Sequence, residues 1–455
     1  MRTTIAAASA LSAACLCGAA GGGTPVPTYY IVYEPDLGCY PNYSFEVGDV
    51  DGDGRMECVV LDQSAKTLRA VRLDGSTAFE HELPNEGTWG TAIPAVADLD
   101  DDGRAEIVVP CPGADGAAGI VVIDGSGRPV ATRGFRTTTK DAYGLTVPLL
   151  AAARLRPGSP PGIVAAITGG PVVALDGALR EVWRVEGLRH DFGHEFHVSD
   201  FDGDGLDEVA FCTVDRIAGP GPAPPVGELL IVDHDGTVLL RRNVSDYAQE
   251  THFDDMAMAD FEGTGTAQVL IEKGILIDLA GSVLWDVAAT IGHGQWIAHT
   301  SDPGGKGRLI FISALWGEAS TSALLTGGGR RLASTGDLAW TQLDPERLKG
   351  WRVLATRPHF ISWSPGEAPE LFVAEQACSP TSHACYKTEE FELRAFILDS
   401  AGGLLATVPF QDAQIEGYWY NGEVRSRVAD VDGDGCDEVV FPRQSGHVMV
   451  LKKRR

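Results

Sequence analysis

The feature that most constrains this chain is a nine-residue acidic pattern that occurs four times in intact form. Aspartates stand at positions 1, 3 and 5, a glycine at position 6 and a glutamate at position 9. Carboxylates at alternate positions of a glycine-bent loop can converge on one hard cation, and oxygen ligands suit Ca²⁺. We therefore predict four Ca²⁺ sites, whose ligands are Asp49, Asp51, Asp53 and Glu57; Asp98, Asp100, Asp102 and Glu106; Asp200, Asp202, Asp204 and Glu208; and Asp430, Asp432, Asp434 and Glu438.

The surroundings of the pattern exclude a calcium-binding helix-loop-helix. That motif needs a glutamate at position 12 and a helix on each side. Here the glutamate comes at position 9 and leads directly into strand-like segments such as "CVV" after Glu57. The acidic loops are therefore expected to connect β-strands.

Degenerate copies of the pattern, which we call worn copies, lie between the intact ones. The copy at Asp260 ("DFEGTGTAQ") has lost most of its carboxylates and is expected to hold no ion. Three further copies begin at Arg154, Thr300 and Ser362, and in the last of these Glu370 stands where Glu208 stands in the copy at Asp200. The resulting units are spaced by roughly 40 to 70 residues, in the range of propeller repeats.

Each unit continues with an apolar strand, a turn and another strand, as in "VVIDGSGRPVA" and "LIVDHDGTVLL". Such segments are typical of β-hairpins. We predict an all-β fold, an eight-bladed or alternatively seven-bladed β-propeller of four-stranded antiparallel blades. The last unit ends after its third strand, and residues 28–33 have strand character, so this N-terminal strand is expected to close the ring.

The expected division of the chain is a signal peptide at residues 1–24 and a single propeller domain at residues 25–455. The start combines a basic residue with short apolar and small-residue runs, which is typical of export signals and favours a secreted or periplasmic protein. No later apolar run is long enough to span a membrane. The formal charge of −27 argues against nucleic-acid partners, and a monomer is expected.

Strand alternation predicts where a site would form. If the acidic loops share one face, then the segments before each repeat and those after each second strand converge around the axis on the opposite face. These segments are rich in candidate residues: Trp89, Tyr143, His190, His194, His252, His293, Arg357, His359, Lys387, Tyr418, Tyr420 and Arg425. His197 alternates inward on its strand and is expected to be a core residue. Gathered aromatic, histidine and arginine side chains suit a sugar chain that carries carboxylates.

Together these features resemble the calcium-dependent β-propeller polysaccharide lyases, and among them the rhamnogalacturonan lyases. The segments "GHEFHVSDFDGDGLDE" and "GHGQWIAHTSD" look like the Gly-His-Gly strand entries of those enzymes. The resemblance implies a secreted lyase that cleaves an acidic polysaccharide, rhamnogalacturonan-like or ulvan-like, by β-elimination at a uronic acid.

The resemblance also implies three catalytic tasks. Arg357, Arg425 or a Ca²⁺ would neutralise the uronic acid carboxylate. His194 or His293 would remove the C5 proton, with His252 or Lys387 as alternatives. Tyr420 or Tyr143 would protonate the leaving oxygen. The remaining members of the set, Trp89, His190, His359 and Tyr418, would bind substrate, as would Tyr143 and Lys387.

Two other functions stay open on the sequence alone. One is a non-catalytic propeller, stiffened by calcium as in integrin-like repeats, that binds a glycan or a protein. The other is glycoside hydrolysis on the same scaffold. Hydrolysis normally needs paired carboxylates, for which the same face offers Glu195, Asp254 and Asp255.

Overall fold

The computed structural model describes seventeen segments of the chain. They are residues 28–39, 45–62, 66–83, 93–111, 117–137, 146–188, 191–192, 196–214, 227–247, 253, 255–316, 321–334, 352–355, 357–378, 391–409, 426–442 and 446–454. The predicted signal peptide lies outside them, so the proposed division at residue 24 stays a prediction.

The described strands form eight antiparallel sheets. Blades one to four contain β2 (Phe45–Gly48), β3 (Glu57–Asp62), β4 (Thr67–Val71) and β5 (Thr77–Glu82); β6 (Ala95–Ala97), β7 (Glu106–Pro110), β8 (Gly119–Ile123) and β9 (Pro129–Gly134); β10 (Leu149–Ala153), β11 (Gly162–Ala166), β12 (Val172–Leu175) and β13 (Glu181–Val185); and β14 (Asp191–Phe192), β15 (His197–Ser199), β16 (Glu208–Val214), β17 (Glu228–Val232) and β18 (Val238–Asn243). A single 3₁₀ turn, η1 (Val244–Asp246), follows β18.

Blades five to eight repeat the arrangement. They contain β19 (Met256–Ala259), β20 (Gln268–Ile271), β21 (Ile275–Asp278) and β22 (Val283–Asp286); β23 (His293–Ser301), β24 (Arg308–Trp316), β25 (Ala323–Thr326) and β26 (Arg331–Ser334); β27 (Arg352–Ala355), β28 (His359–Ile361), β29 (Glu370–Cys378), β30 (Phe391–Leu398) and β31 (Leu404–Pro409); and β32 (Arg427–Ala429), β33 (Glu438–Pro442), β34 (Val448–Lys453) and β1 (Tyr29–Tyr33). One short helix, α1 (Ala288–Ile291), follows β22.

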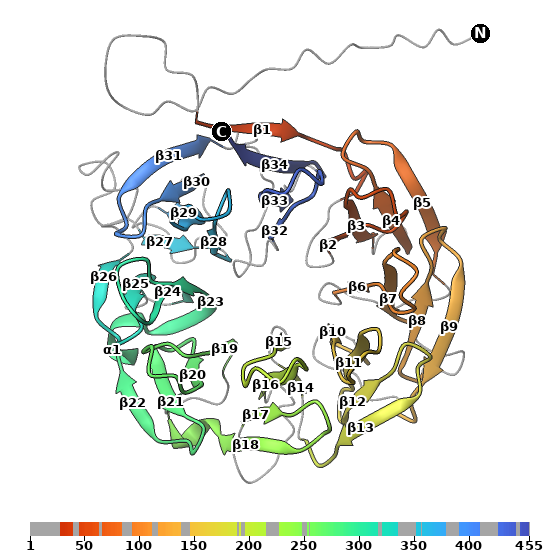
Figure 1. The fold of residues 1–455 in the computed structure, drawn as a ribbon, viewed down its shortest axis with the longest axis horizontal. Helices are drawn as coiled ribbons and strands as arrows, with labels where there is room; N and C mark the ends of the chain where they lie inside the picture. Colours follow the sequence, from red (N-terminus) through yellow and green to blue (C-terminus); the bar gives the residue numbers. More distant parts are fainter. Residues whose placement is uncertain are drawn as a thin grey trace, which may run out of the picture.

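The eight sheets are arranged as a ring of blades (Figure 1). The first strand of each blade, which we call strand A, lies nearest the axis, and strands B, C and D follow outward. In blades four and seven strand A is split, so that β14 and β15 both pair with β16, and β27 and β28 both pair with β29. The prediction of an all-β propeller is confirmed, with eight blades rather than seven.

The core of the ring lies between the blades. Middle strands such as β7 and β8 are buried along their whole length, whereas the outer strand β9 is half-exposed. Among the described residues, eight clusters of buried apolar side chains each join two neighbouring blades, for example Phe196 and Phe211 of blade four with Trp183 of blade three. Each blade is therefore stabilised by both neighbours.

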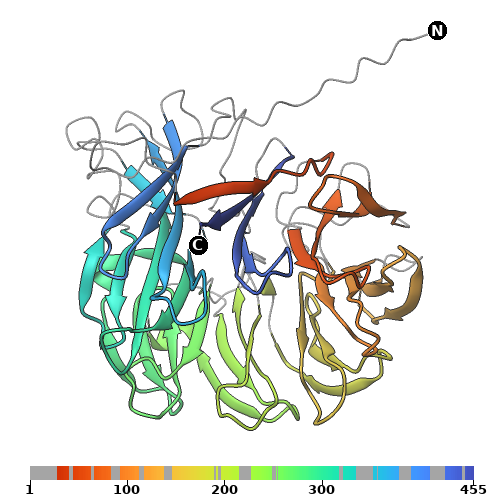
Figure 2. The same cartoon turned by 45° about the horizontal axis from the view of Figure 1, so that its top comes forward.

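The last blade takes its outer strand from the other end of the chain. β1 pairs antiparallel with β34, with Tyr29 opposite Lys453, and Figures 1 and 2 both place β1 beside β34. The buried Tyr29 ring lies 5.6 Å from the Trp363 ring, and its hydroxyl donates to Glu370 Oε2 at 2.6 Å. Burial, together with this carboxylate, raises the pKa of Tyr29, so the hydroxyl stays protonated and donating.

No helix in the described part of the chain has the length and apolar character needed to cross a bilayer.

Substitutions in β1 should measure what the ring closure contributes to stability. Tyr29→Ala should lower the free energy of unfolding by about 3 to 5 kcal/mol, because it leaves a cavity between two blades. Tyr29→Phe should lower the free energy of unfolding by about 1 to 3 kcal/mol, because the hydrogen bond to the Glu370 carboxylate is lost. Tyr30→Ala is the control, because Tyr30 is half-buried and contacts Arg454. If urea unfolding shows that Tyr30→Ala destabilises the protein as much as Tyr29→Ala or more, this role of β1 is contradicted.

Glu375 on β29 should make the stability depend on pH. Its carboxylate is buried with no hydrogen-bond partner among the described residues, and this burial raises its pKa to about 8. Between its ordinary pKa and pH 8 the unfolded chain releases the proton while the folded chain keeps it. Stability should therefore fall as pH rises, by up to about 1.4 kcal/mol per pH unit. Glu375→Gln should remove this slope in unfolding experiments between pH 5 and 8; parallel curves for the two proteins would contradict the assignment.

Candidate functional site

A cavity of about 510 Å³ lies among the A strands around the axis. Residues from seven blades line it. Its polar side chains are three histidines, two arginines and one glutamate. These polar lining residues are His197, His299, Arg357, His359, Arg427 and Glu46. The lining residues lie on strand A or just before it, whereas each acidic loop follows the end of strand A.

One position of the repeat supplies most of this lining. Counting back three residues from the start of an intact or worn acidic loop gives Glu46, Ala95, Ala151, His197, Ile297, His359 and Arg427, and all seven line the cavity. In blade five the same position is Ala257, which is buried. A count from the repeats could therefore have found His197 and Arg427. We had expected His197 to be a core residue, but the inward side of strand A faces the axial cavity.

His197 is held by a buried aspartate. Its Nε2 contacts Asp255 Oδ1, and the Asp255 side chain is 2% exposed against 21% for His197. The other carboxylate oxygen, Oδ2, accepts the backbone N–H of Ile297 at 2.8 Å. Asp255 precedes β19, so one carboxylate connects blades four, five and six. If Nε2 donates to Asp255, the neutral ring carries its lone pair on Nδ1.

Three of the other polar lining residues, Arg357, His359 and Arg427, also contact neighbouring side chains. The guanidinium of Arg357 lies over the Trp296 ring, 5.2 Å from its centroid. His359 Nε2 is 2.7 Å from Ser426 Oγ. Arg427 pairs with Glu46 through two nitrogens, across the boundary between blades eight and one. The lining therefore carries positive charge in a chain whose formal charge is −27.

His299 differs from the other histidines of the cavity. Burial lowers its pKa to about 4, and the charges of Arg308 and His197 contribute. Its ring meets Phe261 edge to face with centroids 5.2 Å apart, and its buried Nδ1 has no hydrogen-bond partner among the described residues. His299 is therefore a neutral ring at pH 7.

The structure places three of the predicted catalytic and substrate-binding residues. Arg357 and His359 line the axial cavity. His293 is not among the described lining residues, and its Nδ1 lies 3.2 Å from the ammonium of the buried Lys273. The other predicted residues lie outside the described part of the chain: Trp89, Tyr143, His190, His194, His252, Lys387, Tyr418, Tyr420 and Arg425. Their roles stay predictions.

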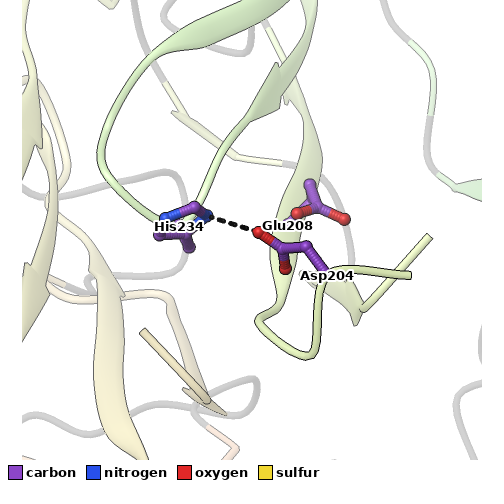
Figure 3. Close-up of side chains that lie close together, drawn as sticks. All are labelled: Asp204, Glu208 and His234. Atoms are coloured by element: carbon purple, nitrogen blue, oxygen red, sulfur yellow. Dashed lines mark ion pairs between the residues drawn. The ribbon is translucent and has the colours of Figure 1, made fainter. Parts of the chain in front are cut away.

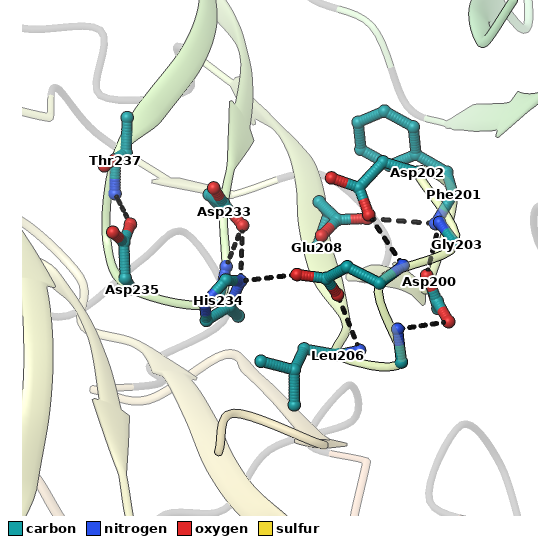
Figure 4. Close-up of polar contacts among 12 residues, drawn as sticks. Asp200, Phe201, Asp202, Gly203, Leu206, Glu208, Asp233, His234, Asp235 and Thr237 are labelled. Carbon is teal, nitrogen blue, oxygen red and sulfur yellow. Dashed lines mark hydrogen bonds and ion pairs between the residues drawn. The ribbon is translucent and has the colours of Figure 1, made fainter. Parts of the chain in front are cut away.

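The acidic loops share one backbone arrangement, seen for the loop at Asp200 in Figure 4. Asp200 accepts the N–H groups of Gly203 and Gly205 at 2.8 and 3.0 Å. Both glycines have positive φ values, 83° and 91°, which side chains with a Cβ rarely adopt. Glu208 Oε2 accepts the N–H of Phe201 at 2.9 Å. The glutamates of the other three intact loops make the same bond, which leaves their second oxygen for another partner.

The donor set of these loops fits a divalent cation. Carboxylate oxygens of Asp200, Asp202 and Glu208 lie within 4.8 Å of one another, as do oxygens in each of the other intact loops. Ca²⁺ takes oxygen ligands at about 2.3 to 2.6 Å, so one ion could reach all three. Glu208 Oε1 is buried without a hydrogen-bond partner among the described residues. Burial raises the pKa of Glu57, Glu106 and Glu208 to about 7, and nearby aspartates add to each shift.

A histidine stands beside the loop at Asp200. His234 Nδ1 lies 3.7 Å from Asp204 Oδ2, and the pair faces Glu208 (Figure 3). An oxygen or nitrogen atom of each of these three residues lies within 4.8 Å of the others. His234 comes from the C–D turn of the same blade, so this turn and the acidic loop meet around one group of donors.

Comparisons with known proteins agree with this architecture. A family model described as an FG-GAP-like repeat matches residues 49–109. Rhamnogalacturonan endolyase YesW of Bacillus subtilis (strain 168) is 25% identical over 411 residues, which cover 73% of this chain and 61% of that protein. The chain resembles the rhamnogalacturonan lyases. The resemblance expected from the acidic loops is confirmed, although this chain matches less than two thirds of the length of that relative.

Two solved structures share the fold over nearly the whole chain. The exotype rhamnogalacturonan lyase YesX has a TM-score of 0.60 and 21% identity, covering 97% of this chain and 75% of the other. The rhamnogalacturonan lyase PL11 of Bacillus licheniformis has a TM-score of 0.57 and 20% identity, covering 93% of this chain and 72% of the other. At these identities the two structures establish the propeller architecture.

Asp255 should contribute to stability through the three blades that it connects. Asp255→Ala should lower the free energy of unfolding by about 2 to 4 kcal/mol, because the Ile297 N–H and His197 both lose a buried acceptor. Asp255→Asn should lose less, since it keeps one acceptor. Asp74→Ala, in an exposed turn of blade one, is the control and should unfold like the wild type. Equal denaturant midpoints for Asp255→Ala and its control would contradict the bridging role.

Proposed function

We propose that this protein is a polysaccharide lyase that cleaves a uronic-acid-containing polymer by β-elimination. The observation that supports this most directly is the axial cavity, where arginine and histidine side chains gather in an otherwise acidic protein. The likeness to rhamnogalacturonan lyases makes a rhamnogalacturonan-like polymer the first substrate class to test, and an ulvan-like polymer the second. The proposal includes export to the periplasm or exterior, where such polymers are found, and action as a monomer.

Substrate binding in this proposal depends on the cationic side of the cavity. The C5 proton of a uronic acid becomes acidic when a positive charge neutralises the neighbouring carboxylate. Arg357 is our first candidate for this contact, with its guanidinium supported on the Trp296 ring. Arg427 is already paired with Glu46, so its main effect would be to fix the cavity wall. Arg425 stays an alternative outside the described residues.

We assign proton removal to His197. Asp255 would orient its ring, and Nδ1 would take the C5 proton, as in other histidine bases held by a carboxylate. A double bond then forms between C4 and C5 as the C4–O bond breaks, and an acid protonates the leaving oxygen. Tyr420 or Tyr143 remains the proposed acid. His293 is less suited as the base than we expected, because its Nδ1 faces the Lys273 ammonium; His194, His252 and Lys387 remain alternatives.

We also propose that the loops that begin at Asp49, Asp98 and Asp200 bind Ca²⁺ through the carboxylates named above. A bound ion would neutralise these convergent carboxylates, and so stabilise the connection between strands A and B. The loop at Asp430 differs, because a lysine ammonium lies among its carboxylates.

Elimination fits the described cavity better than hydrolysis does. A glycoside hydrolase of the usual kind needs two carboxylates on either side of the bond that breaks. Among the described lining residues Glu46 is the only acid, and it pairs with Arg427. Asp255 is held by His197 and the Ile297 N–H, while Glu195 and Asp254 lie outside the described residues.

The lyase proposal predicts that purified protein raises the ultraviolet absorbance of rhamnogalacturonan or another uronic-acid polymer by forming unsaturated uronides. Arg357→Ala should lower kcat/KM about 10²- to 10³-fold, since it removes charge stabilisation. His197→Ala should lower kcat about 10²- to 10⁴-fold, since it removes the base. His81→Ala, on the outer strand β5, should keep wild-type rates.

Two outcomes would count against these assignments. Wild-type rates for a folded His197→Ala protein would remove His197 from the scheme and return His194 to first place. A folded wild type that binds these polymers without producing unsaturated ends would instead support the non-catalytic binding propeller.

A further inference from the structure

One position of the repeat carries opposite charges in different blades. It is the residue that follows strand C and opens the C–D turn. In five blades it is an aspartate: Asp124, Asp176, Asp233, Asp278 and Asp399. Its N–H bonds to the carbonyl four residues ahead, and in Asp124, for example, the carboxylate accepts the N–H groups of Ser126 and Arg128. The aspartate is therefore part of the turn.

The last blade has no C–D turn, because its strand D is β1 from the other end of the chain. The corresponding residue is Lys452, since Leu451 pairs with Val439 of strand B as Val232 pairs with Val209 in blade four. At this place the backbone continues in β34, where Lys452 pairs with Tyr30. A cationic side chain is allowed at this position, as it also is in blade one, where Arg72 opens the C–D turn.

The Lys452 ammonium lies among the carboxylates of the fourth acidic loop. Its Nζ is 2.8 Å from Asp432 Oδ2, 2.9 Å from Asp434 Oδ2 and 2.7 Å from Glu438 Oε1. The Lys452 side chain is 10% exposed and that of Glu438 is fully buried. These three carboxylates stand at positions 3, 5 and 9 of the pattern, where the other intact loops present their cation ligands.

The neighbouring lysine does the same for the worn loop of blade seven. Lys453 Nζ is 2.8 Å from Glu370 Oε1 and 3.0 Å from Glu367 Oε2. Glu370 also accepts hydrogen bonds from Tyr29 and from the Trp363 indole at 2.6 and 2.7 Å. Two successive lysines of β34 thus neutralise acidic groups of blade eight and of blade seven.

The other intact loops are different. Within the described part of the chain, no ion pair joins a lysine or arginine to the carboxylates at positions 1, 3, 5 and 9 of the loops at Asp98 and Asp200; Arg154 pairs with Asp207, at position 8. In the loop at Asp49, Arg72 pairs with Asp51 alone, through Oδ2 at 2.7 Å. The three-carboxylate contact is therefore a property of the last blade among the loops described.

We propose that Lys452 takes the place of Ca²⁺ in the loop at Asp430, so that the blade that closes the ring holds its acidic loop without a metal ion. The ammonium and an ion bound by the same three carboxylates would occupy one volume. Lys452 also belongs to β34, the strand that carries β1, so the ion pairs connect the loop directly to the closing strand. This inference depends on the proposed calcium binding at the other loops.

Calcium counting tests the inference. Metal-free protein would be dialysed against calcium chloride, and bound calcium per chain measured for the wild type and single variants. Asp432→Asn should bind as much calcium as the wild type, because its loop holds none. Asp202→Asn should bind one ion fewer. Lys452→Met should bind one ion more, and the double variant Lys452→Met/Asp432→Asn should lose that gain.

Lys453→Met is the matched control, because the worn loop of blade seven lacks the aspartates of the pattern, so no calcium should be gained. Thermal unfolding gives a second readout: Lys452→Met should melt below the wild type in chelator and recover when calcium is added, unlike Lys453→Met. Should Lys452→Met fail to fold, the comparison of Asp432→Asn with the wild type still decides.

The possible results separate this inference from the calcium proposal. If Asp432→Asn binds one calcium ion fewer than the wild type, the role of Lys452 is overturned and the proposal of calcium binding stands. A wild type without calcium would overturn the calcium proposal, and one ion gained by Lys452→Met would then still support the role of Lys452. No calcium in either protein would overturn both.

Discussion

The packing of each blade against its two neighbours is the constraint on which the rest of this structure depends. No blade has a core of its own: each of the eight apolar clusters among the described residues is shared by two sheets. Backbone hydrogen bonds also join successive acidic loops, as from Ala105 to Asp49 and from Met56 to Val431. The second of these crosses the boundary between the last blade and the first. A ring built in this way is complete only when that boundary is made and blade eight has its outer strand β1, from which Tyr29 contacts blade seven.

The sequence was sufficient to predict the fold because the repeat is periodic and its loop chemistry is local. Aspartate and glycine positions define the loop, and the spacing of loops defines the blades. The cavity was only partly predictable. Arg357 and His359 were found because they precede a repeat, whereas His197 was misread: on strand A of a propeller the inward direction leads to the axis. Asp255 is a candidate carboxylate in the sequence, but its contacts with His197 and Ile297 could not have been predicted, because these partners come from two other blades and no spacing relates them.

The four intact loops show how similar motifs can have different charged surroundings. The pattern at Asp430 matches the pattern at Asp200 at every acidic position. What separates them is a side chain on another strand, and only strand register reveals that Lys452 corresponds to Asp233. Topology contributes to this difference: where strand D comes from the N-terminus, the C–D turn that an aspartate opens in five other blades is absent. A motif search would assign calcium to both loops, whereas the surrounding charges favour a calcium ion only in the loop at Asp200.

Each short strand A also connects the axial cavity to an acidic loop. His197 begins β15 and Asp200 follows its last residue; Arg427 begins β32 and Asp430 follows its last residue. A cavity residue and the first residue of an acidic loop are thus three residues apart on one short strand. Whatever cation fixes the loop therefore fixes the strand that presents the cavity side chain. If that cation is Lys452 in blade eight, as proposed, the Arg427–Glu46 pair at the boundary of blades eight and one would keep its geometry at any calcium concentration, while His197 would depend on the ion proposed at Asp200.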